Sequence, residues 1–196
     1  AICGNNAWQQ VWASRAARSG TSGEGPVAEG TVAILGLGLM GGSLARDLAG
    51  LGHRVLGWDR DAASARGALA EGCIHGVLGS ASPGGGSRPH TFGGVEEADV
   101  VVLALPVAAS RETLTALAPR LQASLVTDVG STKRGIVAAA EAAGLADRFV
   151  GSHPLAGDHR SGWKASRPGL FRGVPCFLCP ARGASDATVD RAAPLW

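Results

Sequence analysis

The 196-residue chain has little of several features that mark particular protein classes. It has no tyrosine, only 5% aromatic residues and four cysteines, too few for a disulfide scaffold. Its 18 basic and 16 acidic residues leave a net charge of +2, so it has no general attraction to nucleic acid or anionic membrane. The absence of any run of about 18 apolar residues excludes a transmembrane helix. We therefore expect neither nucleic acid nor membrane as a partner, and a cytoplasmic location.

Glycine and apolar residues are plentiful, at 30 residues and 45% respectively. A chain of this length buries a core without disulfides or metals. Residues 1–29 are the exception, because they show little apolar periodicity and end in a glycine- and serine-rich stretch. That composition predicts a disordered tail. Arg15 and Arg18 precede its first acid, Glu24, so a targeting peptide is the alternative.

From Thr31 onwards, short apolar runs alternate with segments of helical periodicity. Alternation at these intervals specifies a parallel sheet with helices on both faces. The predicted fold is therefore α/β, a doubly wound parallel sheet of the Rossmann type, spanning residues 30–184. We expect strands over 31–35, 54–59, 98–106, 124–128 and 148–151, helices over 39–52, 61–72, 107–122 and 132–144, and a loop over 79–94 with a very short strand near 90–92.

Residues 36–41 read G-L-G-L-M-G, a G-x-G-x-x-G motif between a strand and a helix. Gly36 permits a tight turn, Gly38 lets the backbone approach a pyrophosphate, and Gly41 allows close packing of helix and strand. The helix N-terminus then faces the negative charge, with Leu39 and Met40 beside it. The motif predicts a dinucleotide site; the alternative is a glycine-rich turn without a ligand.

Asp59 ends the second predicted strand, 18 residues after Gly41. A carboxylate there binds the adenosine ribose hydroxyls, which favours NAD over NADP. Arg60 follows, and either stacks on the adenine or tolerates a 2′-phosphate, so NADP is the second choice.

The chemistry should come from the carboxyl ends of the later strands, where ligands of such sheets bind. Leu105 and Pro106, at the end of an apolar strand, are expected against the cofactor. His153 comes directly after a strand, where a neutral imidazole can accept a proton from a substrate hydroxyl while hydride leaves the same carbon. Ser131 is placed to hydrogen-bond that hydroxyl or to orient the ring. The alternatives are a structural loop histidine and a serine that caps a helix.

Four segments of the chain carry a resemblance to a known family. VAILGLGLMGGSLARDL, ADVVVLALPV, DVGSTK and GSHPLAG occur in the order and spacing of the prephenate and arogenate dehydrogenases of tyrosine biosynthesis, over about residues 31–180. The resemblance implies that prephenate gives hydride from its ring carbinol carbon to NAD+ and loses CO2, leaving 4-hydroxyphenylpyruvate. Arogenate would give tyrosine. His153 matches the catalytic histidine of the family, which hydrogen-bonds the ring hydroxyl, and Ser131 matches its polar partner.

The resemblance also implies a longer enzyme, because family members continue into a helical domain that makes the dimer and supplies a substrate-binding arginine. Residues 185–196 are expected to begin a linker helix to that domain, which is absent here. We therefore expect a homodimer only with it, and dinucleotide binding with little or no turnover from this chain alone. His159 stands where many relatives carry an acidic residue, so no gating role is carried over to it.

For the other candidate residues, a functional role stands beside a purely structural one. Cys176 and Cys179 lie in a predicted strand, where an offset of three puts the sulfurs on opposite faces, so we expect ordinary cysteines and no metal. Lys133 contacts substrate or cofactor, or else it is a solvent-facing lysine in the first turn of a helix. Arg160 and Lys164 meet an anionic substrate, or else they lie in a solvated loop.

Two rival functions stay open. One is an oxidoreductase like the β-hydroxyacid dehydrogenases, which GLGLMG and GHRV-x-x-WDR would suit. Those enzymes take their catalytic lysine from a later domain and lack the pair of DVGSTK and GSHPLAG. The other is a dinucleotide-binding module without catalysis.

Overall fold

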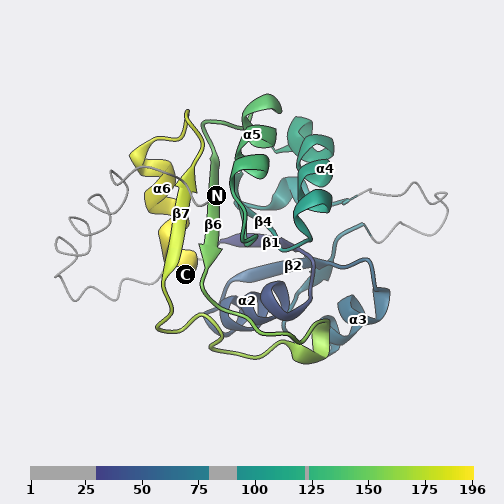
Figure 1. Cartoon of the computed structure of the whole chain (residues 1–196). Coiled ribbons are helices and arrows are strands. Elements are labelled where there is room, and N and C mark those ends of the chain that lie inside the picture. Colours follow the sequence, from purple (N-terminus) through teal and green to yellow (C-terminus); the bar gives the residue numbers. More distant parts are fainter. Residues whose placement is uncertain (1–29, 80–91, 122–123) are drawn as a thin grey trace.

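A computed structural model describes residues 30–79, 92–121 and 124–196 of the chain (Figure 1). The predicted tail over 1–29 lies outside the described residues, and so do residues 80–91 of the predicted loop. None of the helices in the part that is described is long and apolar enough to cross a membrane.

Strands and helices alternate along the described chain, as the sequence pattern predicts. The strands are β1 (Thr31–Leu35), β2 (Arg54–Trp58), β3 (Gly76–Val77), β4 (Val100–Leu103), β5 (Leu125–Asp128), β6 (Phe149–Pro154) and β7 (Cys176–Pro180). The helices are α2 (Leu39–Gly50), α3 (Ala62–Ala70), α4 (Val107–Leu117), α5 (Arg134–Ala142) and α6 (Asp186–Ala192), and the short 3-10 turns are η1 (Val95–Glu97), η2 (Ala118–Arg120), η3 (Trp163–Ala165) and η4 (Ala193–Leu195).

The strands form one sheet in the order β3-β2-β1-β4-β5-β6-β7. β1 to β6 are parallel, which confirms the predicted doubly wound fold. β7 runs antiparallel to β6, so the expectation of a purely parallel sheet is wrong at this edge. The reason is that residues 155–175 start and finish at the carboxyl end of β6, and β7 must enter the sheet from that end.

Helices cover both faces of the sheet (Figure 1). α4 and α5 pack on one face through Leu114, Leu117 and Ile136, against buried residues of β1, β4 and β5. α2 and α3 pack on the other face through Leu44, Leu48 and Ala65. α6 places Ala192 against Leu125 and Val150, at the β5–β6 end. The central strands β1, β4 and β5 are therefore covered on both sides, which explains their largely apolar sequences. β7, at the edge of the sheet, leaves the side chain of Phe177 exposed.

Several predicted boundaries are wrong. The helix expected over 107–122 ends as α4 at Leu117 and passes into the 3-10 turn η2, because Pro119 has no N–H to continue the α-helical hydrogen bonds. The strand expected over 98–106 pairs only over Val100–Leu103, because the chain turns at Ala104 into the approach to α4. The strand expected over 148–151 extends to Pro154, because β7 pairs with its last residues. The third strand is the two-residue β3, and Phe92, the described end of the strand expected near 90–92, is not in a strand. α6 begins where a helix was expected, behind an N-cap at Ser185.

Candidate cofactor and active site

The glycine turn between β1 and α2 leaves no room for side chains at two positions. Gly36 has φ of +98°, and a Cβ there would lie 2.4 Å from the carbonyl oxygen of Ala104. A Cβ on Gly41 would lie 1.9 Å from the carbonyl oxygen of Gly36. The two glycines thus let α2 start directly against the ends of β1 and β4, where the strand order reverses.

A cleft of about 550 Å³ opens at this point of the sheet. No side chain caps the N-terminus of α2, and the space in front of Gly38 is open, with the backbone nitrogen of Gly162 the nearest atom at 3.8 Å from a Cβ placed there. Backbone N–H groups at such a terminus attract anions. The lining residues are Gly38, Leu39, Met40, Ala104, Val129, Ser131, His153, Pro154, Ala156, Gly157, Asp158, Arg160, Ser161 and Gly162.

Asp59 follows β2 and turns its carboxylate toward the glycine turn. Its Oδ2 accepts a hydrogen bond of 2.7 Å from the backbone N–H of Leu37, and its Oδ1 accepts one of 2.8 Å from Asp61. These bonds fix a negative charge beside the start of α2, where it can accept hydroxyl donors and repel phosphate. Arg60 is exposed.

Of the residues expected to bind the cofactor, Gly38, Leu39 and Met40 line the cleft. The others do not, namely Gly36, Gly41, Asp59, Arg60, Leu105 and Pro106. Ala104 lines it instead of Leu105 and Pro106. The carbonyl of Leu105 accepts a hydrogen bond from the Ser110 hydroxyl at 3.1 Å, and Pro106 precedes α4.

His153 lines the cleft from within β6, not from a loop after it. It pairs with Phe177 of β7, and the two rings lie 6.5 Å apart. The ring is half-buried, and this burial, together with the nearby Lys133 ammonium, lowers the pKa of His153 below its ordinary value. Asp128 opposes the shift. The imidazole is therefore neutral at neutral pH and able to accept a proton.

Ser131 lies across the cleft in the segment between β5 and α5. Its side chain is exposed and lines the same cleft as His153. α5 begins at Arg134 with Lys133 at the N-cap position, so the alternative that Ser131 caps this helix is wrong.

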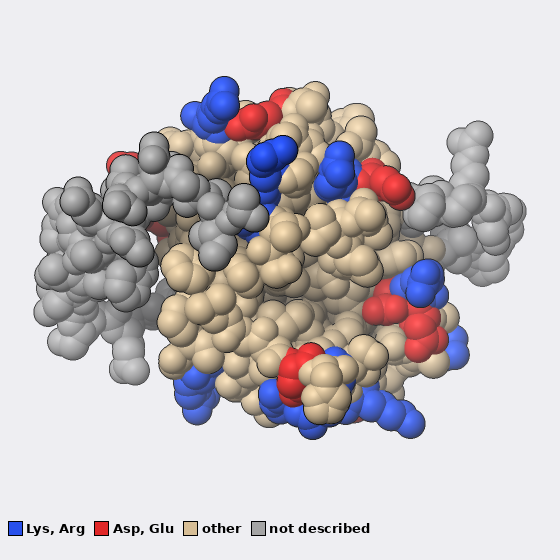
Figure 2. Space-filling view, viewed as in Figure 1, with Lys and Arg blue, Asp and Glu red and all other residues tan. Residues whose placement is uncertain are grey.

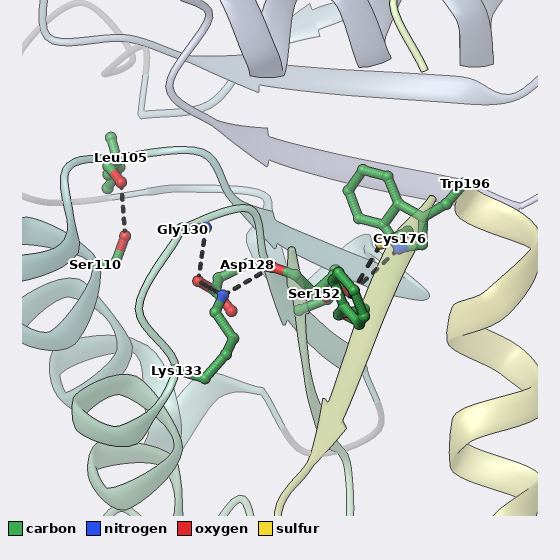
Figure 3. A network of polar contacts seen from close by, with 10 residues as sticks. Leu105, Ser110, Asp128, Gly130, Lys133, Ser152, Cys176 and Trp196 are labelled. Atoms are coloured by element: carbon green, nitrogen blue, oxygen red, sulfur yellow. Dashed lines mark hydrogen bonds and ion pairs between the residues drawn. The ribbon is translucent and has the colours of Figure 1, made fainter. Parts of the chain in front are cut away.

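The most buried charges of the site, Asp128 and Lys133, were not predicted as a pair. Lys133 Nζ lies 2.5 Å from Asp128 Oδ2 and donates a second bond of 2.7 Å to the carbonyl of Ser152. The backbone N–H of Gly130 also donates to Asp128 Oδ2, at 2.9 Å. Lys133 is thus neither solvent-facing nor in the first turn of α5. It is also not among the residues that line the cleft. It ties the Ser131 segment to the residue before His153 (Figure 3).

A second polar chain reaches the same strand from the opposite side. The Trp196 indole N–H donates to the Ser152 hydroxyl at 3.1 Å (Figure 3). That hydroxyl lies 2.8 Å from Oγ1 of Thr127. Trp196 also meets Phe171 edge to face, with ring centroids 5.5 Å apart. β6 is therefore held from both sides directly before His153.

The remaining candidates lie apart from this chemistry. Cys176 and Cys179 lie in β7, and burial raises the pKa of Cys176 to about 12. Among the described residues, no group of three or more histidine, cysteine or acidic side chains is arranged to hold a metal. His159 and Lys164 are exposed.

The fold and the cleft together define a Rossmann-type nucleotide-binding domain of the dehydrogenase kind. The family described as "Prephenate dehydrogenase, nucleotide-binding domain" matches residues 44–196. The prephenate dehydrogenase of Bacillus subtilis (strain 168) is 35% identical over 171 residues, which are 82% of this chain and 42% of that protein. The chain therefore belongs to the prephenate dehydrogenase family.

Solved structures agree with this membership. Prephenate dehydrogenase from A. aeolicus, in complex with hydroxyphenyl propionate and NAD+, superposes with a TM-score of 0.74 at 30% identity, covering 88% of this chain and 58% of that one. Synechocystis arogenate dehydrogenase gives 0.73 at 26% identity, covering 84% and 55%. The chain thus spans about half the length of the relatives it matches.

Proposed function

We propose that this chain is the NAD-binding part of an enzyme that oxidises and decarboxylates prephenate, or its amino counterpart arogenate, in tyrosine biosynthesis. The observation that carries the proposal is that His153 and Ser131 line the same cleft as Gly38, Leu39 and Met40. A proton acceptor and an anion-binding helix N-terminus thus share one cavity. Membership of the family supports the choice of this substrate class.

The residues present fit a dinucleotide. The uncapped N-terminus of α2 and the open space at Gly38 suit a diphosphate, with Leu39 and Met40 beside it. Asp59 is placed to accept the hydroxyls of the adenosine ribose, and its fixed charge disfavours a 2′-phosphate, so NAD is the expected cofactor in preference to NADP. When bound, NAD+ supplies the acceptor for a hydride.

His153 would move the proton of the reaction. As the ring carbinol carbon gives up its hydride, the hydroxyl proton passes to the neutral imidazole and a C=O bond forms. The bond to the ring carboxylate then breaks, CO2 leaves, and its electron pair completes the aromatic ring. The new phenolic oxygen takes a proton back from His153. Ser131 would hold the hydroxyl while this happens.

The other half of the enzyme would lie in a helical domain that follows residues 185–196. We expect that domain to supply an arginine for the substrate and the contacts of a homodimer. On this view the chain alone binds the dinucleotide but turns over little or no substrate.

Calorimetry of this chain with NADH and NADPH tests the proposal first. NADH should bind more tightly than NADPH; absence of any NADH binding would refute the proposal. A chain extended to the length of its relatives should then reduce NAD+ with prephenate or arogenate. Reduction of NAD+ with 3-hydroxyisobutyrate instead would identify a β-hydroxyacid dehydrogenase. Binding of NADH without turnover of any of these three substrates would identify a non-catalytic module.

A further inference from the structure

The segment that follows β6 folds back over the start of α2. Gly157 has φ of +111°, and a Cβ there would lie 3.4 Å from the sulfur of Met40. The backbone N–H of Arg167 donates to the Ser43 hydroxyl at 3.0 Å, and that of Gly169 donates to Asp47 at 2.7 Å. The segment therefore forms one wall of the cleft, fixed to the helix that forms the opposite wall.

A cluster around Arg46 fastens the same segment further. The Arg46 guanidinium lies 4.1 Å from the ring centre of Trp163 and donates to Ser166 at 3.0 Å. It also pairs with Glu71 at 2.8 Å, and Glu71 accepts the Trp163 indole N–H at 2.9 Å. Because α2, α3 and η3 are joined in this way, residues between Gly157 and Trp163 have a defined position over the glycine turn.

Three charged side chains of this wall form a trio. Asp158 accepts bonds from Arg160 Nε at 3.1 Å and Nη2 at 2.6 Å, and from Arg167 Nη1 at 3.1 Å. These two guanidinium groups hold the pKa of Asp158 far below its usual range. The trio therefore carries a net positive charge, and Asp158 fixes the plane of the Arg160 guanidinium.

Only one of the two arginines faces the cavity. Arg160 lines the cleft together with Gly38 and Gly162, and Arg167 is not among the lining residues. Arg160 is also the one lysine or arginine among the described residues that line the cleft. Most of the middle of the face in Figure 2 is uncharged, and acidic and basic atoms lie together along its upper, right and lower edges.

We propose that Arg160 is a binding residue for the diphosphate of the dinucleotide. Arginine forks bind phosphate oxygens in a bidentate manner, and Arg160 Nη1 is not used by Asp158. The N–H groups of α2 would hold the diphosphate from one side and Arg160 from the other. This inference rests on the proposed function, since it presumes a dinucleotide in the cleft.

A carboxylate of the substrate offers the same chemistry to Arg160. The diphosphate is favoured because Gly162, two residues from Arg160, is the nearest neighbour of the open space at Gly38. ADP-ribose distinguishes the two, because it keeps the diphosphate and lacks both nicotinamide and substrate.

The test measures dissociation constants of NADH and ADP-ribose by calorimetry for this chain and three variants. Arg160→Gln should weaken both ligands by about 5- to 20-fold, the scale of an exposed charge-assisted contact. Arg160→Lys should fall between, since it keeps the charge and loses the fork. Arg167→Gln is the matched control: it removes the other partner of Asp158 and should leave both constants within about two-fold. Thermal melting checks that each variant is folded.

Each outcome has a separate meaning. If the unchanged chain binds neither ligand, the proposed function fails and this inference with it. If it binds both and Arg160→Gln binds equally well, the inference alone is wrong. Equal losses in Arg160→Gln and Arg167→Gln would show that the loop, not a direct contact, was lost. A loss for NADH without a loss for ADP-ribose would place Arg160 at the nicotinamide end and overturn the diphosphate assignment.

Discussion

Lys133 and Asp128 form an ion pair that is almost completely withdrawn from solvent, with 6% and 2% of their side chains exposed. Lys133 also donates to the carbonyl of Ser152, one residue before His153. The pair therefore joins the segment that carries Ser131 to the strand that carries His153. Its place beneath the cleft makes it a positioning device for both.

Replacement of Lys133 should destabilise the fold because it leaves the buried carboxylate of Asp128 without its partner. Lys133→Met should lower the free energy of unfolding by about 3–5 kcal/mol, the usual cost of removing one partner of a buried pair. The double variant Asp128→Leu/Lys133→Met removes both charges and should recover much of that loss. Urea denaturation measures both. A single variant as stable as the unchanged chain would contradict the buried pairing.

Titration of His153 should follow its surroundings. Burial and the Lys133 ammonium disfavour the charged imidazole, so in the folded chain the pKa should lie below the ordinary 6.5. In the extended enzyme, the midpoint of the fall in kcat at acid pH should then lie below 6.5. NMR of the ring protons gives the folded value, and the same chain in urea is the control. A folded value at or above the unfolded one would contradict this account.

Gly41 should tolerate no side chain. Gly41→Ala places a methyl group 1.9 Å from the Gly36 carbonyl, so α2 must move and the chain should lose at least about 2 kcal/mol of stability. Gly50→Ala is the control in the same helix, because nothing lies within 4 Å of its Cβ. It should be neutral or stabilising by up to about 1 kcal/mol. Similar melting temperatures for the two variants would contradict the close packing at Gly41.

Asp59 should matter for the dinucleotide and Asp61 should not. Asp59→Ala should weaken NADH binding by roughly 1–3 kcal/mol, the scale of charge-assisted hydrogen bonds to the ribose. Asp61→Ala removes the same charge two residues later, where the side chain caps α3, and should leave NADH affinity unchanged. Calorimetry compares them. Equal NADH affinity in the Asp59 variant and the unchanged chain would remove the assignment of the ribose to Asp59.

The alternating pattern of the sequence predicted the order of elements and the glycine turn, because the central strands are buried on both faces and the helices each have an apolar side. The direction of β7 was not predictable from the residues CFLCP, since the apolar pattern of a short strand does not depend on whether the strand runs parallel or antiparallel to its neighbour. β6 extends to Pro154 because its last residues pair with β7, so this extension was not predictable either.

The Asp128–Lys133 pair was missed for a different reason. Lys133 stands in a short polar segment that resembles a solvated turn, and lysine is seldom buried. One signal was available: Asp128 ends an apolar strand, and Lys133 is the nearest cation in the chain. Arg160 carried no such signal, because its place in the cleft depends on contacts of the β6–β7 segment with α2.

If His153 takes the proton while NAD+ takes the hydride, the nicotinamide end of NAD+ must lie beside His153. NMR of the His153 ring protons during addition of NAD+ and of ADP-ribose tests it most directly, since ADP-ribose lacks only the nicotinamide. Both ligands should bind, and the His153 signals should shift clearly with NAD+ and little with ADP-ribose. NAD+ binding that leaves the His153 signals unmoved would contradict the account.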